Sequence, residues 1–219
     1  MKRLRLWFAA TLVVLVASGG LWVWWELGAN RRPLTITKSQ SQIVGLLDAS
    51  GWVSALPQPP GGRLTDRASL LYLVSYRDCP GCIAFEKQEF AKLRAANVMT
   101  RVIVIAQPDL NGRPQSTPAE RATVAELWVN RSWSLYDRWV GTPVGDWTAS
   151  GVPPADGDAA RTAVIDSGRS MGAQLTPLLK ANGLASGYPI LIWWDSKGAM
   201  RGCVCGPHSF DSVARELGA

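Results

Sequence analysis

Charged residues and histidine are scarce in this chain of 219 residues. Only 18% of the residues are charged and 47% are hydrophobic, a balance that excludes an intrinsically disordered chain. The sequence also lacks internal repeats and long low-complexity tracts, and its length suits one ordinary domain plus an anchor. The single histidine, His208, follows the last cysteine. We interpret it as a surface or helix-capping residue rather than a catalytic base.

The net charge of +6 is concentrated near the N-terminus. Residues 1–32 contain five basic residues and one acidic residue, and so carry four of the six net positive charges. The rest of the chain is nearly neutral. We therefore expect the basic residues to set membrane topology, and we expect no nucleic-acid partner.

The longest run without charge extends from Trp7 to Trp25. As a helix it would be about 28 Å long, close to the hydrocarbon thickness of a bilayer. Tryptophans near both ends are typical of membrane interfaces, and the basic residues before the run predict a cytoplasmic segment at 1–6. We expect a transmembrane anchor at 7–25, with a signal peptide cleaved near residues 17–19 as the alternative. Either places the remaining chain outside the cytoplasm.

Residues 26–62 are expected to form a stem and linker. Ser39 to Leu47 favours a short helix, Trp52 and Val53 favour the start of a strand, and Pro57 to Gly62 has loop composition. The globular domain is expected to occupy residues 63–219.

A strand–helix–strand pattern opens this domain. Ser69–Ser75 is a near-continuous apolar run, as expected for a strand buried on both faces, and Arg101–Ala106 is interpreted as a second buried strand. Between them, Ile83–Ala96 has helical spacing of its apolar residues. Cys79 and Cys82 therefore lie where the first strand ends and the helix begins.

A helical insertion is expected at about 107–185. Pro118 to Val140 favours one helix with Thr117 as its N-cap, and Asp158 to Asn182 favours a second, interrupted near Gly168, Gly172 or Pro177.

Two strands and a helix then complete the domain. These elements are expected at Pro189–Trp194, Ala199–Cys205 and Ser209–Leu217, with a hairpin turn between the strands.

The Cys79-Pro80-Gly81-Cys82 motif favours thiol–disulfide chemistry. The attacking species is a thiolate, and the start of a helix stabilises an anion, while Cys82 one turn later can resolve a mixed disulfide. Pro80 suits the first helical turn, and Gly81 allows a partner chain to approach. Asp78 before the motif would raise the pKa of Cys79, and glutamates 86 and 89 are expected on a solvated face. A structural disulfide or a zinc site shared with Cys203 and Cys205 are the alternatives.

With these motifs, residues from about Ser69 to Gly218 resemble the thioredoxin-like superfamily, and the insertion is similar to that of bacterial periplasmic Dsb proteins. The C-terminal half resembles the catalytic domains of their isomerase-type members. The resemblance implies an α/β thioredoxin-like fold and a cis Tyr188–Pro189 bond opposite the dithiol, with both residues contacting the substrate. The Pro-Gly dipeptide and Tyr188 depart from the usual family pattern, so the direction of the reaction stays open.

The resemblance implies an enzyme of the bacterial inner membrane with a periplasmic domain. Its substrates would be protein thiols and disulfides, and a partner redox protein, which could itself lie in the membrane, would supply or accept electrons. No metal or organic cofactor is implied. A dedicated thiol reductant, a metallochaperone and a non-catalytic assembly module are alternatives. The assembly module predicts a buried Cys79 and slow exchange.

Cys203 and Cys205 form a second pair. Two residues apart in an expected strand, they share one face and would be nearly 7 Å apart between Cα atoms if extended. Flanking Gly202 and Gly206 could let the chain bend enough to close a disulfide. A redox relay and a structural disulfide are equally consistent with this pattern, and a pair of inert buried thiols is the third possibility.

Overall fold

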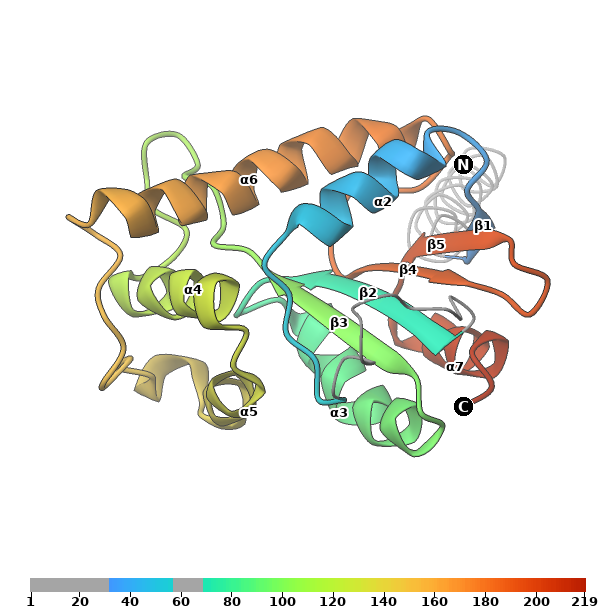
Figure 1. The fold of residues 1–219 in the computed structure, drawn as a ribbon, viewed down its shortest axis with the longest axis horizontal. Helices are drawn as coiled ribbons and strands as arrows, with labels where there is room; N and C mark the ends of the chain where they lie inside the picture. The colour runs from blue at the N-terminus through green and yellow to red at the C-terminus, as the bar shows by residue number, and fades with distance from the viewer. Residues whose placement is uncertain (1–31, 57–68) are drawn as a thin grey trace, which may run out of the picture.

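The computed structural model describes residues 32–56 and 69–219 of the chain. They form a mixed α/β fold around one five-stranded sheet with the order β1-β5-β4-β2-β3 (Figure 1). The strands are β1 (Leu34–Thr35), β2 (Leu70–Ser75), β3 (Met99–Val104), β4 (Ile190–Trp194) and β5 (Met200–Val204). The helices are α2 (Gln40–Ala49), α3 (Pro80–Ala95), α4 (Pro118–Asn130), α5 (Trp133–Gly141), α6 (Ala159–Lys180) and α7 (Phe210–Glu216), with short 3₁₀ turns η3 (Val144–Asp146) and η4 (Pro207–Ser209).

Helices cover both faces of the sheet. Alternate residues of β2 and β4 belong to two separate hydrophobic clusters, as the two-residue period of a strand requires. One cluster joins the sheet to α2 and α6, and the other joins it to α3, α4, α5 and α7 and includes Ile165 of α6. Figure 1 shows α2 and α6 together on one side of the sheet, with α3 and α7 on the other. The sheet is therefore the middle layer of three.

The expected order of elements is confirmed. β2 and β3 are parallel and are connected by α3, whereas β2–β4 and β4–β5 are antiparallel. Every residue of β2 and β3 is buried, which explains the apolar runs at 70–74 and 102–104. β3 also contains Thr100 and Arg101, which are buried polar residues. Val53 forms an isolated antiparallel bridge with Val102 at the β3 edge, in place of the strand expected there.

The helical insertion differs from the sequence expectation in two places. The helix expected from Pro118 to Val140 is divided into α4 and α5, because Arg131 adopts a left-handed conformation with φ 50° and Ser132 caps a new helix. Conversely, α6 is continuous where an interruption was expected, with Pro177 inside it. The N-cap at Thr117 is confirmed, since its side chain accepts a hydrogen bond from the N–H of Glu120.

The stem also contributes to the sheet. Leu34 and Thr35, expected in a polar stem, form β1 and pair antiparallel with β5. Asn182 at the end of α6 accepts hydrogen bonds from the N–H groups of Thr37 and Lys38, at 2.9 and 2.8 Å. These contacts attach the chain before α2 to the domain.

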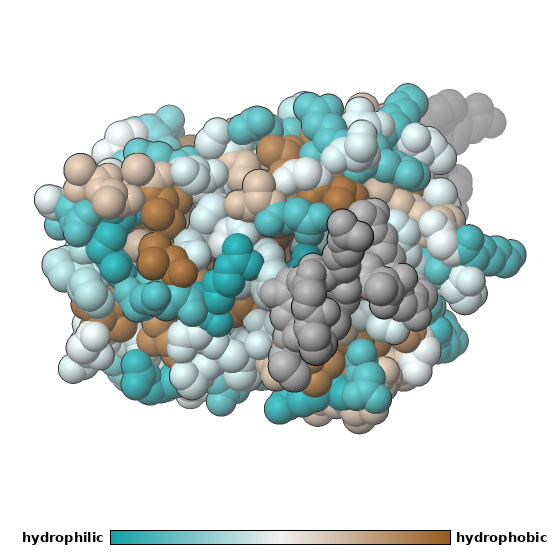
Figure 2. Space-filling model, viewed as in Figure 1, coloured by the Kyte–Doolittle hydropathy of each residue, from teal (hydrophilic) through white to brown (hydrophobic). Residues whose placement is uncertain are grey.

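Within the two described segments, no helix is long and apolar enough to cross a membrane. The anchor expected at 7–25 lies outside them. On the face shown in Figure 2, hydrophobic side chains form separate patches among polar ones.

Candidate functional site

The first cysteine pair lies at the start of α3. Cys79 is the N-cap residue, and its sulfur accepts a hydrogen bond from the N–H of Cys82 at 3.1 Å. Pro80 occupies the first turn, where the missing N–H has no helical partner to lose. Cys79 and Cys82 form a disulfide, with 5.2 Å between their Cα atoms. The backbone thus places the first sulfur where unpaired helical N–H groups favour a negative charge.

Tyr188 and Pro189 lie against this helix start. The Tyr188–Pro189 bond is cis, as the resemblance implied. A Cβ atom added to Gly81 would lie 3.0 Å from Cδ of Pro189 and 3.6 Å from the carbonyl oxygen of Tyr188. The ring of Tyr188 packs edge to face with that of Tyr76, with centroids 5.3 Å apart. The fold thus places residues 76–82 next to Tyr188 and Pro189, which lie more than a hundred positions later in the sequence.

Exposure differs along the motif. Pro80 is exposed and Gly81 is partly exposed, whereas Cys79 and Cys82 are each only 1% exposed. In this disulfide form, an external sulfur atom has no open approach to either cysteine. A cysteine that exchanges with a partner must be reached by the partner's sulfur atom, so the burial of Cys79 is the feature expected of the non-catalytic assembly module.

The acidic residues of α3 also differ from expectation. Glu89, expected on a solvated face, is 1% exposed, and its Oε1 accepts a hydrogen bond from Nζ of Lys92 at 3.0 Å. Glu86 is partly buried four residues after Cys82, and burial raises its pKa to about 7, although Tyr136 and Arg77 act in the opposite direction. A carboxyl group that titrates near neutral pH therefore lies one helical turn from the disulfide.

Arg77 and Tyr136 surround this carboxyl group. Arg77 is mostly buried, donates a hydrogen bond to the carbonyl oxygen of Thr142 and lies over the ring of Trp139, 5.5 Å from its centroid. Tyr136 of α5 is 1% exposed, and burial raises the pKa of its hydroxyl group well above the usual value. Sequence reasoning missed this group because nothing local to α3 shows that α5 packs against it. The four-residue spacing of Cys82 and Glu86 was the only available signal.

Asp78 stays at the surface beside the motif. Its carboxylate is exposed and accepts a hydrogen bond from the side-chain amide of Gln107 at 3.1 Å. Its charge is therefore shared with solvent and an amide group, so its influence on the neighbouring cysteine is screened.

The second cysteine pair is also a disulfide. The Cα atoms of Cys203 and Cys205 are 5.2 Å apart, closer than an extended chain would place them, so the backbone bends at the end of β5. Cys203 is 1% exposed and Cys205 is 2% exposed. Because the two cysteines are joined in this structure, they are not the inert buried thiols of the third possibility.

Metal-binding alternatives gain no support from the described residues. In them, no group of three or more histidine, cysteine or acidic side chains could hold a metal ion. His208 was expected to be a surface or helix-capping residue. The structure does not describe its side chain, so this stays a prediction.

Comparisons with known proteins assign no family and no function to this site. No protein-family model matches this chain, and no curated protein matches its sequence.

Proposed function

We propose that the protein is a thiol–disulfide oxidoreductase with a thioredoxin-like fold, acting on protein thiols and disulfides through Cys79 and Cys82. The observation that carries the proposal is the packing of Pro189 and Tyr188 against Gly81, at a helix start capped by Cys79. A purely structural disulfide between Cys79 and Cys82 would not require a distant segment of the chain to pack against Gly81, which lies between the two cysteines.

Exchange at this site would proceed by two sulfur displacements. A substrate thiolate attacks the sulfur of Cys79, forming a mixed disulfide and releasing the thiolate of Cys82. A second substrate thiolate then attacks the substrate sulfur, so the substrate becomes oxidised and Cys79 leaves as a thiolate. The N–H of Cys82 and the start of α3 would stabilise that thiolate. Run in reverse, the same steps reduce or isomerise a substrate.

The proposed setting is the periplasmic side of a bacterial inner membrane. The uncharged run from Trp7 to Trp25 would anchor the chain, and the basic residues before it would remain in the cytoplasm. Electrons would pass to or from a partner redox protein, with no metal or organic cofactor at the dithiol.

Redox titration of the full-length chain in glutathione buffers tests this function. We expect the Cys203→Ser/Cys205→Ser variant to titrate reversibly and the Cys79→Ser variant to lose exchange at that pair. A potential well above the thioredoxin value of about −270 mV would indicate an oxidant or isomerase, and a potential near it a reductant.

The burial of Cys79 favours a second candidate. A non-catalytic assembly module would keep its disulfide covered and use the surrounding surface for docking, and Cys79 is 1% exposed. This candidate predicts no reversible exchange in the native protein. If the protein is an oxidoreductase, the residues that bury Cys79 are instead expected to move aside when a partner chain binds.

A further inference from the structure

The second disulfide closes a very short loop. Cys203 and Cys205 are separated by Val204 alone. A disulfide stabilises a fold mainly by restricting the unfolded chain, and this effect is smallest for the shortest loops. Stability is therefore a weak reason for a cysteine pair at this position.

The second pair lies at the end of the β4–β5 ladder that adjoins Pro189. In the β4–β5 ladder, Ile190 is opposite Val204 and Leu191 is opposite Cys203. Pro189 comes directly before Ile190, and Cys205 comes directly after Val204. Cys205 therefore lies just beyond the bend that follows this end of the ladder, and Pro189, at the same end, lies against Gly81 between the first two cysteines.

Both pairs also lie on the same side of the sheet. Cys203 and Cys205 belong to the hydrophobic cluster that includes Phe85 of α3 and Phe210 of α7. These two rings pack edge to face with their centroids 4.9 Å apart. Phe85 is three residues after Cys82, and Phe210 is five residues after Cys205. The helix that begins at the first pair therefore packs against the segment that follows the second pair.

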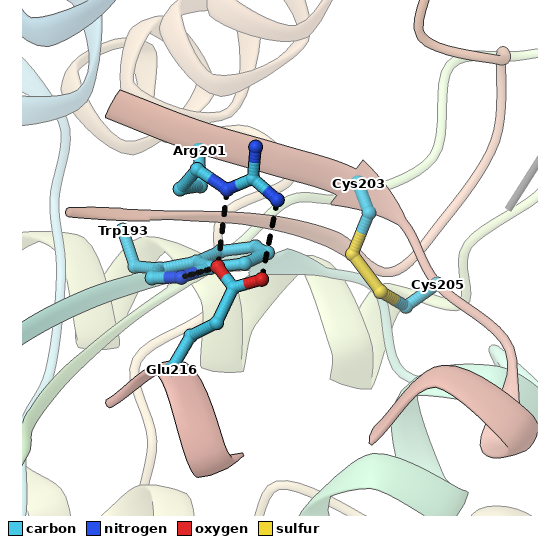
Figure 3. The surroundings of a disulfide bond; sticks show 5 residues. All are labelled: Trp193, Arg201, Cys203, Cys205 and Glu216. Carbon is cyan, nitrogen blue, oxygen red and sulfur yellow. Dashed lines mark hydrogen bonds and ion pairs between the residues drawn. A yellow bond between two sulfur atoms is a disulfide. The ribbon is translucent and has the colours of Figure 1, made fainter. Parts of the chain in front are cut away.

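The second pair is closed to external proteins. Both cysteines are at most 2% exposed. Near them, Glu216 of α7 forms hydrogen bonds of 3.1 Å with Arg201 and accepts another from Trp193 at 3.0 Å, which attaches α7 to β4 and β5 (Figure 3). The first pair is equally buried, but Pro80 beside it is exposed, whereas Val204 and Gly206 beside the second pair are buried. A redox partner within the chain therefore suits the second pair, and the first pair lies on the same face.

We propose that Cys203–Cys205 is a second redox centre, which exchanges two electrons with Cys79–Cys82 inside the protein. This inference rests on the function proposed above for the first pair. After an external dithiol protein has reduced Cys79 and Cys82, a thiolate of this pair attacks the Cys203–Cys205 disulfide and releases one thiolate. The remaining thiol of the first pair, as a thiolate, then attacks the first-pair sulfur of this mixed disulfide and releases the second thiolate of Cys203–Cys205. The first pair ends as a disulfide and the second as two thiols, so electrons and protons balance.

Time-resolved thiol labelling tests the relay. The oxidised full-length chain is mixed with excess reduced thioredoxin, quenched with N-ethylmaleimide and analysed by peptide mass spectrometry. We expect Cys79 and Cys82 to be labelled first and Cys203 and Cys205 afterwards. In the Cys79→Ser/Cys82→Ser variant, labelling of the second pair should slow by about tenfold or more, because both internal donors are lost.

A trapped intermediate provides an independent readout. In the Cys82→Ser and Cys79→Ser variants, the remaining cysteine of the first pair is expected to form a disulfide with Cys203 or Cys205 and leave one free thiol. Circular dichroism and thermal melting confirm that each variant is folded.

The outcomes separate the two proposals. If the first pair reacts but the second stays oxidised in native wild-type protein, the relay is overturned and the oxidoreductase stands. The same conclusion follows if the second pair is labelled equally fast in the variant that lacks both Cys79 and Cys82. If neither pair reacts, both proposals fail.

Discussion

The two cysteine pairs lie on the same side of the sheet, but different backbone elements hold them. Cys79 caps a helix, and its sulfur accepts a hydrogen bond from a helical N–H group. Cys203 belongs to β5, a strand whose backbone groups pair with β4 on one side and β1 on the other. A helix start has N–H groups left over for an anion, whereas the N–H groups of a central strand are used by the sheet. The first pair should therefore provide the better nucleophile.

The two pairs also differ in their neighbouring surface. Beside the first pair, Pro80 is exposed and Gly81 is partly exposed, so a partner chain can touch this motif. Beside the second pair, Val204 and Gly206 are buried. Two disulfides can therefore be equally buried and still have different roles, because a partner chain's access to each depends on the residues between and around the cysteines.

Substitution of the first cysteine should produce the largest difference between the pairs. We expect Cys79→Ser to lower the rate of insulin disulfide reduction by about a thousandfold or more, because the nucleophile is removed. The matched Cys203→Ser/Cys205→Ser variant should retain a rate within about threefold of wild type, since its first pair is intact. Equal losses in the two variants would contradict the division of roles.

The carboxyl group near the first pair should make stability depend on pH. The pKa of Glu86 is raised by burial from 4.5 to about 7, so the folded state binds this proton more tightly than the unfolded state. Its stabilising effect is present below about pH 4.5 and is lost as pH rises to about 7. Glu86→Gln should therefore raise the free energy of unfolding by about 2 kcal/mol at pH 8 and change it little at pH 4. Urea denaturation at both values measures this, and an equal effect at both would contradict it.

The order of strands and helices could be predicted because buried strands leave continuous apolar runs. The runs at 70–75 and 190–194 are strands in which every residue is buried. The position of the Cys79–Cys82 motif followed from the same pattern. The break between α4 and α5 could not be predicted, since Arg131 adopts positive φ and no glycine or proline marks the position.

Tertiary packing explains the other differences. An interruption of the helix was expected near Gly168, Gly172 or Pro177, but the helix is continuous and the two glycines allow close approach of other side chains instead. Cβ atoms at these positions would lie 3.1 Å from the Trp128 ring and 3.3 Å from the Tyr188 hydroxyl oxygen. The burial of Glu86 likewise depends on α5, which is remote in sequence. Local patterns cannot show which distant side chain will occupy such a space.

The contact between Gly81 and Pro189 joins the first pair to the segment directly before β4, the strand that pairs with β5, and it can be altered alone. In Gly81→Ala, the new Cβ atom would lie 3.0 Å from Cδ of Pro189, so one of the two segments must shift. We expect exchange with substrate and transfer to Cys203–Cys205 both to slow by about tenfold, because both depend on this alignment. Insulin reduction and thiol labelling measure the two rates.

A glycine remote from both pairs provides the control. A Cβ atom at Gly45 of α2 would meet nothing within 4 Å. Gly45→Ala should stabilise the protein by about 0.5–1 kcal/mol through helix propensity and leave both rates unchanged. If Gly81→Ala behaves like this variant, the contact has no role in exchange.

The ion pair of α7 should affect the second cysteine pair and leave the first unaffected. Glu216→Gln weakens the interaction with Arg201, whose side chain is 19% exposed, and should lower the free energy of unfolding by about 1 kcal/mol. Because α7 then opens more often, direct reduction of Cys203–Cys205 by dithiothreitol should accelerate by about threefold in a Cys79→Ser/Cys82→Ser background. The matched variant is Glu126→Gln, which removes a pair of similar burial with Arg161 between α4 and α6. It should lower stability to a similar extent without accelerating reduction, and equal acceleration in both variants would show that global unfolding rather than local opening exposes the second disulfide.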